Sequence, residues 1–272
     1  SAVFYNLQEV FMYYLDVHSH IYPEAISRKA TESTCRFYNV STGHNGTAAE
    51  LLALDREVGI KRSVLLPVSV NPVHTESINN FTLRECIEHP EFIPFATVHA
   101  DNADISETAS KFVGQGFKGV KLHPDMQGFN ADDERLFPMY DIIAGKIPLM
   151  VHSGDPRYNF SHPERIRRVL HEFPSIIIIA AHMGGWSMQD TALEFLRDEE
   201  RCFTDTSSAL SSMSVEKAMT LINAYGTDRV MFGSDYPIED PAYNRELVER
   251  LPLSDGQREK IAHINAEKLL GL

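Results

Sequence analysis

Cysteine and long apolar runs are both scarce in this chain of 272 residues. The three cysteines, Cys35, Cys86 and Cys202, are odd in number and show no CxxC spacing, so the sequence predicts neither a disulfide framework nor a zinc site built on thiolates. This usage fits a reduced, cytoplasmic compartment best. The longest apolar run, residues 176–181, has the length of a strand and is far shorter than a membrane span.

Positive charge is also in short supply. Lysine and arginine total 25 against 38 acidic residues, which gives a formal net charge of −13. Nucleic acid is therefore disfavoured as a partner, because phosphate binding requires basic surfaces. A small-molecule substrate stays compatible, since a local basic pocket can lie within an acidic protein.

Apolar runs of strand length alternate with helical segments along the whole chain. Strands are predicted over 12–20, 62–69, 92–100, 117–124, 147–154, 175–184, 202–208 and 229–236. Helices are predicted over 47–58, 75–88, 104–115, 133–146, 163–173 and 215–225. One more follows the sixth strand and ends near residue 200, and two further helices precede the C-terminus. Nearly continuous apolar strands are typical of parallel strands covered by helices. Eight such units predict an α/β fold, a distorted (β/α)8 TIM barrel. A doubly wound sheet is the alternative, but no GxGxxG follows the first strand.

No linker, repeat or low-complexity tract divides the chain, so a single domain is expected over residues 12–272. Residues 1–11 lack the features of a signal peptide and are interpreted as an N-terminal extension or a cloning remnant. Residues 21–46 are polar without clear periodicity, which favours a long loop that covers the site as a lid. Thr47 and Glu50 then form the pattern of a capping box.

Candidate functional residues fall where the predicted strands end. Alternate side chains of a strand share a face, so His18 and His20 point the same way. In a TIM barrel the C-terminal strand ends form the active site. The residues at these ends are His18, His20, Lys121, His123, His152, His182 and Asp235. Imidazoles and a carboxylate gathered at one edge predict a site for a divalent metal.

Six motifs in order resemble those of one enzyme family. They are DVHSH at 16–20, GVKLHP at 119–124, VHSG at 151–154, AHMGG at 181–185, FGSDYP at 232–237 and NAEKLLGL at 265–272. In combination, the chain resembles the amidohydrolase superfamily of metal-dependent TIM-barrel enzymes, within it the amidohydrolase-related (amidohydrolase type 2) branch. The resemblance covers nearly everything after Met12.

The resemblance implies a division of roles. His18, His20, His152 and Asp235 would be the ligands of one divalent metal, for which zinc is expected and Mn, Fe or Co also suit the donors. Asp235 would also orient or accept the proton of the attacking water. His182 would be the general acid or base, with a fifth metal ligand as the alternative.

Other candidates have more than one interpretation. Lys121 binds a substrate carboxylate, pairs with an acidic neighbour or, as in binuclear relatives, bridges a second metal after carboxylation. His123 is a substrate or supporting group, or a packed core residue. Arg157 and Tyr158 contact substrate or form a solvated loop pair. Dimers are common among members of the family, so a homodimer is compatible.

Further candidates lie on the predicted strand at 202–208 and among the remaining histidines. Asp205 and Ser207 either support the site by hydrogen bonds or cap the following helix. Trp186 walls the pocket or serves packing. His99 is a weak site candidate. The other histidines are predicted at the surface: His44, His74, His89, His162, His171 and His263.

The leading hypothesis is a hydrolase in which activated water attacks the carbonyl of a lactone, ester or amide. The alternative is a non-oxidative decarboxylase of an aromatic or unsaturated carboxylic acid, a lyase that would use the same residues. A TatD-type deoxyribonuclease is less favoured, because the middle strand lacks the bridging glutamate of that family. A non-catalytic metal-binding protein is a fourth reading. The loops at 21–46, 124–132, 155–162 and 236–244 are expected to select the substrate.

Overall fold

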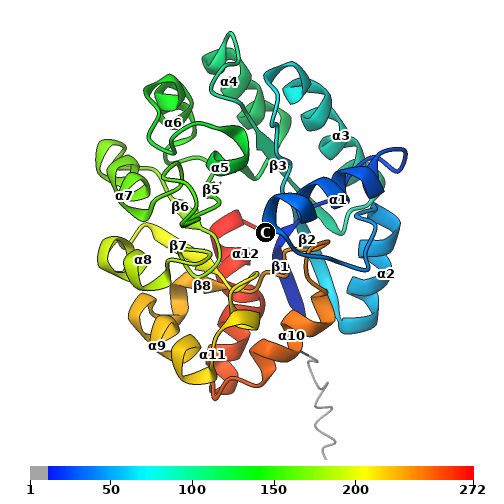
Figure 1. The fold of residues 1–272 in the computed structure, drawn as a ribbon, viewed down its shortest axis with the longest axis vertical. Helices are drawn as coiled ribbons and strands as arrows, with labels where there is room; N and C mark the ends of the chain where they lie inside the picture. The colour runs from blue at the N-terminus through cyan, green and yellow to red at the C-terminus, as the bar shows by residue number, and fades with distance from the viewer. Residues whose placement is uncertain (1–11) are drawn as a thin grey trace, which may run out of the picture.

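The computed structural model describes residues 12–272, so the interpretation of residues 1–11 lies outside it. Its central feature is a sheet of eight parallel strands, surrounded by helices in Figure 1. The strands are β1 (Tyr14–Ser19), β2 (Ile60–Leu65), β3 (Phe92–Thr97), β4 (Gly119–Leu122), β5 (Leu149–Val151), β6 (Ile178–Ala180), β7 (Cys202–Asp205) and β8 (Val230–Met231). Their spatial order is their order in the chain.

The last strand returns to the first and closes the sheet. The backbone nitrogen of Val17 donates to the carbonyl of Phe232 at 2.9 Å, and His20 donates to Tyr236 at 2.7 Å. A parallel bridge joins Ser19 and Tyr236. These bonds confirm the predicted (β/α)8 TIM barrel. No helix among residues 12–272 is long and apolar enough to cross a membrane.

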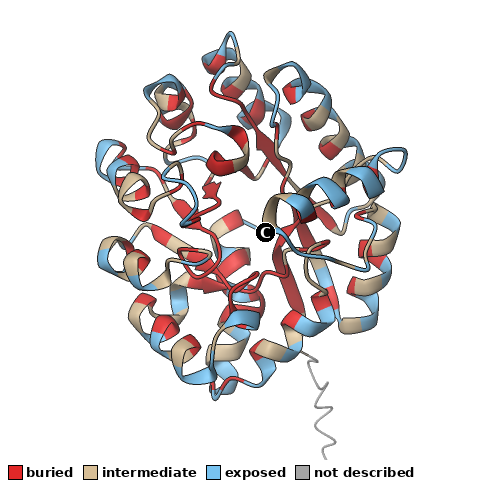
Figure 2. Ribbon diagram, in the orientation of Figure 1, coloured by how far each residue is buried: buried red, intermediate tan, exposed pale blue. Residues whose placement is uncertain are grey.

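The helices are α1 (Ser27–Tyr38), α2 (Ala48–Val58), α3 (Thr75–Glu88), α4 (Ile105–Gln115), α5 (Pro124–Gln127), α6 (Phe137–Ile143), α7 (Pro163–Glu172), α8 (Gln189–Leu196), α9 (Val215–Tyr225), α10 (Pro241–Glu249), α11 (Asp255–Glu259) and α12 (Asn265–Leu270). Most helices surround the barrel in Figure 1, whereas α1 and the last helix overlap its central region in this view. Figure 2 shows burial concentrated in the strands and on the inner helix faces. Ala266 and Leu270 of α12 pack with Leu15, Met150 and Met231 of the strands, so the barrel is filled.

Helix α1 corrects the prediction of a long loop at 21–46. Its buried residues are Ser27, Thr31 and Cys35, which repeat every four positions along one face. None of them is large or strongly apolar, so the helix carries no hydrophobic stripe that a sequence pattern would reveal. The helix nevertheless covers part of the barrel mouth in Figure 1.

The predicted capping box is half formed. The side chain of Thr47 accepts a hydrogen bond from the backbone nitrogen of Glu50, which confirms it as the N-cap of α2. The Glu50 carboxylate instead accepts from the backbone nitrogen of Asn45 at 2.7 Å and from the Tyr236 hydroxyl, also at 2.7 Å. Glu50 thereby joins the segment before α2 to the end of β8.

The hydrogen-bonded strands are shorter than predicted because the chain leaves the sheet before each strand-end residue. His152 follows β5, His182 follows β6 and Asp235 follows β8. One prediction of surface position is wrong. His263 is buried, and its ring stacks on Tyr13 with 4.0 Å between centroids, because the C-terminal helices close against β1.

Candidate metal centre and active-site cavity

Three strand-end side chains converge as the sequence predicts. His18 and His20 leave β1 on the same side, and Asp235 reaches them from the segment after β8. The carboxylate oxygen Oδ1 of Asp235 lies 3.5 Å from Nε2 of His18 and 3.4 Å from Nε2 of His20. Donor atoms bound to one cation at about 2.1 Å are separated by about 3.0 to 3.4 Å, so these three residues fit a divalent metal.

Hydrogen bonds on the far side of each ring orient both histidines. Nδ1 of His18 lies 3.0 Å from Oδ2 of Asp205, and Nδ1 of His20 lies 2.6 Å from the carbonyl of Leu66. An acceptor at Nδ1 favours the tautomer with its proton on that nitrogen, in which the lone pair of each Nε2 is on the side of Asp235. Acceptors of this kind behind metal-binding histidines fix the ring and raise its basicity.

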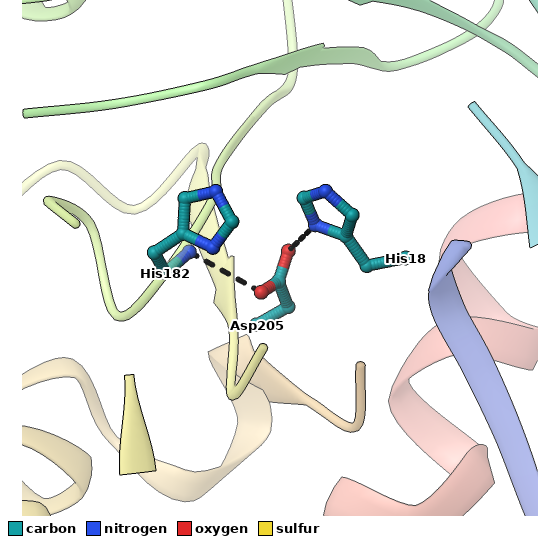
Figure 3. A group of neighbouring side chains, drawn as sticks. All are labelled: His18, His182 and Asp205. Atoms are coloured by element: carbon teal, nitrogen blue, oxygen red, sulfur yellow. Dashed lines mark hydrogen bonds and ion pairs between the residues drawn. The ribbon is translucent and has the colours of Figure 1, made fainter. Parts of the chain in front are cut away.

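Asp205 supports two site residues at once. Figure 3 shows its carboxylate between His18 and His182, where Oδ1 accepts from the backbone nitrogen of His182 at 3.2 Å. The Ser207 backbone also donates to Oδ1 at 3.0 Å. The next helical turn begins after Ala209 and has no side-chain cap. The structure therefore shows the supporting interpretation of Asp205 rather than the helix-capping one.

Asp16 fixes β1 against β8 just below the site. Its carboxylate accepts from the backbone nitrogens of His18 and Ser234 at 2.8 and 3.0 Å and from the Ser234 hydroxyl at 2.5 Å. Gly233 allows this close approach, because a Cβ there would lie 3.0 Å from Cβ of His18. Full burial raises the pKa of Asp16 to about 6.

His182 lies between β7 and the ring of His152. Its Nδ1 is 2.9 Å from the carbonyl of Ser207, and its Nε2 is 3.0 Å from Nδ1 of His152. Both His182 and Asp235 have positive φ angles, 63° and 66°, which non-glycine residues adopt rarely. Such backbone conformations persist where the surrounding structure imposes them, and they gather at functional sites.

His152 belongs to a second group of side chains. Its ring stacks on His123 at a centroid distance of 4.0 Å, and both face the buried Asp125. The Tyr38 hydroxyl lies 2.5 Å from Nε2 of His123. His152 is outside the group of donor atoms that His18, His20 and Asp235 form. Its expected role as a metal ligand stays a prediction.

Burial controls the protonation of these rings and of Lys121. Burial, followed by the neighbouring Lys121, lowers the pKa of both His18 and His123 well below the ordinary value. Nζ of Lys121 lies 3.2 Å from Nε2 of His18. Burial also lowers the pKa of Lys121, to about 8, although Asp235 and Asp205 favour its charged form. With a pKa of about 8, Lys121 keeps its ammonium form at neutral pH, whereas burial favours the neutral rings of His18 and His123.

Asp235 stays ionised despite burial. Burial alone would raise its pKa, but His18, His20 and His182 lower it well below the ordinary value. The Ser208 hydroxyl donates to its Oδ2 at 2.5 Å. One carboxylate and two oriented imidazoles are the donor types that suit Zn or Mn.

Arg157 and Tyr158 are placed beside the site rather than within its cavity. Arg157 forms an ion pair with Asp155 at 2.6 Å and donates to the carbonyl of Phe37 at 2.5 Å. Its guanidinium lies over the rings of Phe37, Tyr38, Tyr158 and Trp186. These contacts attach the end of α1 to the loop after β5. Substrate contact by either residue stays a prediction.

A cavity of about 680 Å³ opens from the candidate metal centre. Seven of the strand-end candidates line it: His18, His20, Lys121, His123, His152, His182 and Asp235. The weak candidate His99 does not line it, and its Nε2 lies 3.2 Å from the carbonyl of Gln127. Elements α1 and α3 and the segment after β2 supply its outer walls.

Tyr38, Asp125 and Asp16 are site residues that no sequence pattern singled out. Tyr38 lies in the segment predicted to be a loop, so no helical pattern pointed to it. Asp125 directly follows the GVKLHP motif, and its position after a strand-end Pro was the available signal. Asp16 belongs to the DVHSH motif, but its contact with Ser234 depends on the closure of the barrel.

Comparisons with solved structures find the same fold. An uncharacterised TIM-barrel protein from Bordetella bronchiseptica is 19% identical, with a TM-score of 0.79 and coverage of 95% of this chain and 98% of that one. A dihydroxybenzoic acid decarboxylase from Polaromonas, with bound manganese and the inhibitor 2-nitroresorcinol, gives 16% identity, a TM-score of 0.73 and coverage of 96% and 97%. The 5-carboxyvanillate decarboxylase of Sphingomonas paucimobilis is 14% identical, with a TM-score of 0.73 and coverage of 96% of this chain and 99% of that one.

Sequence comparisons identify the family. No curated protein sequence matches the chain. The sequence profile described as amidohydrolase matches residues 16–272, which is nearly the whole barrel and includes each candidate ligand from His18 to Asp235. The chain therefore belongs to the amidohydrolase family of TIM-barrel proteins.

Proposed function

We propose that the protein is a metal-dependent, non-oxidative decarboxylase of a small carboxylic acid. The observation that carries the proposal is the buried ammonium of Lys121 beside His18, His20 and Asp235 in one cavity. A buried cation beside a cation-binding group suits an anionic substrate. The decarboxylase alternative is thus favoured over the hydrolase hypothesis, which the comparisons do not confirm. Two of the similar structures are decarboxylases that act in this fold.

A divalent metal held by His18, His20 and Asp235 would supply positive charge that orients the substrate and stabilises charge developing next to its carboxylate. Lys121 provides a second positive group from β4 at the same place. Its Nζ lies 3.2 Å from Nε2 of His18, which places the ammonium at the inner end of the cavity. These groups can hold the acid in one orientation against the apolar outer walls.

In the proposed reaction the bond between the carboxylate and its carbon breaks, and carbon dioxide leaves. The electron pair stays on that carbon, which then receives one proton. His182 is suited to deliver it, because its Nδ1 lies 2.9 Å from the carbonyl of Ser207 and its side chain lines the cavity. Burial lowers the pKa of His182, which makes its protonated form a stronger acid.

The test supplies purified protein, reconstituted with Mn or Zn, with aromatic and unsaturated carboxylic acids. Parallel reactions contain lactones and esters. Carbon dioxide release, with one deuterium incorporated at the former carboxyl-bearing carbon in heavy water, would support the proposal. Acid release from a lactone or ester without carbon dioxide would instead establish the hydrolase.

Two variants, Lys121→Met and His182→Asn, separate substrate binding from proton delivery. Lys121→Met should mainly raise KM for carboxylic acids, whereas His182→Asn should lower kcat by about a hundredfold or more, as for loss of a general acid. Lys61→Met is a matched control, because that lysine lies over Tyr13 outside the site. Equal activity of Lys121→Met and Lys61→Met would contradict the role given to Lys121.

A further inference from the structure

The active-site cavity has two chemically different sections. Its inner end is formed by the histidines, Lys121 and Asp235 described above. The outer section lies between α1 and α3 and continues along the segment after β2. Its walls are largely apolar, and the contributing side chains include Ile26, Ala30, Val68, Val70, Ile78 and Phe81.

The cavity is larger than a one-ring substrate requires. An apolar cavity of about 150 Å³ holds a benzene molecule. The cavity here measures about 680 Å³, so a single aromatic ring at the inner end would leave most of the outer section unfilled. Apolar walls favour an apolar occupant, since each methylene removed from water contributes to affinity.

Helix α1 is placed so that it forms one of these walls. Its small buried residues Ser27, Thr31 and Cys35 face the barrel, while Ile26 and Ala30 line the cavity. Ile26 and Val70 are 53% and 55% exposed, although both are aliphatic. Apolar groups gathered at the rim of a cavity indicate a binding surface more than isolated exposed residues do.

Arg84 marks the solvent side of the same section. It lines the cavity, is exposed, and its guanidinium lies 5.7 Å from the centroid of Phe81. None of the ion pairs among residues 12–272 involves Arg84. The outer section thus ends among groups that contact water, and it can accommodate a chain that extends toward solvent.

We propose that the substrate is amphiphilic, with a carboxylate or carbonyl head and an apolar body longer than one aromatic ring. The head lies at the inner end near Lys121, and the body lies between α1 and α3 against Ala30, Ile78 and Phe81. The identity of the head rests on the proposed function. The apolar body is inferred from the cavity itself and does not depend on the reaction.

The test measures binding of linear saturated carboxylates, from butanoate to dodecanoate, by calorimetric titration. Protein with manganese and protein treated with a chelator are both used. Affinity should rise about three- to fourfold with each added methylene until the outer section is filled, and should then level off. Affinity that is independent of chain length would overturn the proposal.

Variants of the cavity wall show where the alkyl chain of the carboxylate binds. Ala30→Trp should lower dodecanoate affinity at least tenfold and leave butanoate unchanged, whereas the matched variant Ala25→Trp, at an exposed position outside the cavity, should change neither. Phe81→Ser removes an apolar wall without adding bulk and should also weaken only the long chains. If the wild type and the three variants bind dodecanoate equally well, its alkyl chain binds elsewhere and the inference is contradicted.

Binding and turnover give separable results. If the chain-length dependence is present while no carboxylic acid loses carbon dioxide, the proposed reaction fails and the amphiphilic site stands. If decarboxylation occurs and long chains bind no better than short ones, the proposed reaction stands and this inference fails.

Discussion

The two groups of histidines at the barrel mouth differ in what lies behind each ring. His18 and His20 have acceptors on Nδ1, from Asp205 and Leu66, and present Nε2 to the ionised Asp235. His123 and His152 instead stack on each other, and the phenol of Tyr38 lies against them. The first arrangement prepares lone pairs for a cation. The second provides neutral, hydrogen-bonded rings along a wall of the cavity.

The neighbouring carboxyl groups differ in the same way. Asp235 lies among imidazoles that keep it ionised. Asp125 is buried beside the Ser161 hydroxyl, and burial raises its pKa to about 7. Only one of its oxygens has a hydrogen-bond partner within the described chain. Donor atoms lie close enough for a cation in both groups, so the groups behind the rings and the charge of the carboxyl group are what distinguish them.

The largest expected effect comes from Asp235→Asn, which removes the anionic donor. Metal content should fall from about one ion per chain toward zero, and kcat/KM should fall about a thousandfold or more, because several kcal/mol of charge stabilisation is lost. Elemental analysis and the carbon dioxide assay measure the two effects. Asp125→Asn is the control and should retain the metal. If only Asp125→Asn lost the metal, the cation would bind at His123 and His152 rather than at His18 and His20.

Asp205→Asn should have a smaller effect on the same group. The amide oxygen can still accept from Nδ1 of His18, but it carries no charge to raise the basicity of the ring. Changes to groups behind metal ligands cost about ten- to a hundredfold in metal affinity. Competition with a chelator of known affinity measures this. If Asp205→Asn binds the metal as tightly as the wild type while Asp235→Asn binds it more weakly, His18 needs no charged partner at Nδ1.

Tyr38→Phe probes the second group with a change of one oxygen. The hydroxyl lost is the partner of His123, and a buried hydrogen bond of this kind contributes about a three- to tenfold effect. We expect kcat to fall by that factor and metal content to stay the same. Tyr158→Phe removes a phenol that lies outside the cavity and should leave both unchanged. A loss of metal in Tyr38→Phe would show that the two groups act as one.

The barrel itself was predictable because parallel strands leave a strong pattern. Apolar runs with helices between them predict eight units, and α3 and α9 begin and end where the sequence indicated. Convergence of His18, His20 and Asp235 followed from the geometry of strand ends. Their role as ligands stays a prediction, because proximity alone does not demonstrate binding.

The missed features depend on contacts between distant residues. Tyr38 meets His123 across 85 positions, and α1 approaches the barrel through serine, threonine and cysteine rather than through an apolar stripe. Asp205 reaches His18 across 187 positions. Sequence patterns report local periodicity, so they do not reveal which acceptor lies behind a given ring or whether a buried carboxyl group carries charge.

Asp55, which lies outside the site, tests whether burial alone keeps a carboxyl group of this protein uncharged. It lies on the buried face of α2, and its Oδ2 accepts from Ser63 at 2.7 Å. Burial raises its pKa to about 8, with a further contribution from Asp16. No histidine is among the causes of this shift. The folded protein thus holds a proton that the unfolded chain releases near the ordinary value of 3.8. Wild-type stability should therefore fall as pH rises from about 4 to about 8.

Asp55→Asn abolishes that titration and still accepts from Ser63. Its melting temperature should exceed that of the wild type by several degrees at pH 8, with the difference shrinking toward pH 4. Thermal melts across this range, with Glu57→Gln on the exposed face of α2 as the control, measure it. A pH-independent difference would mean that Asp55 is ionised in the fold. Burial would then not suffice to neutralise a carboxyl group here, and the charge of Asp235 would need no explanation from its histidines.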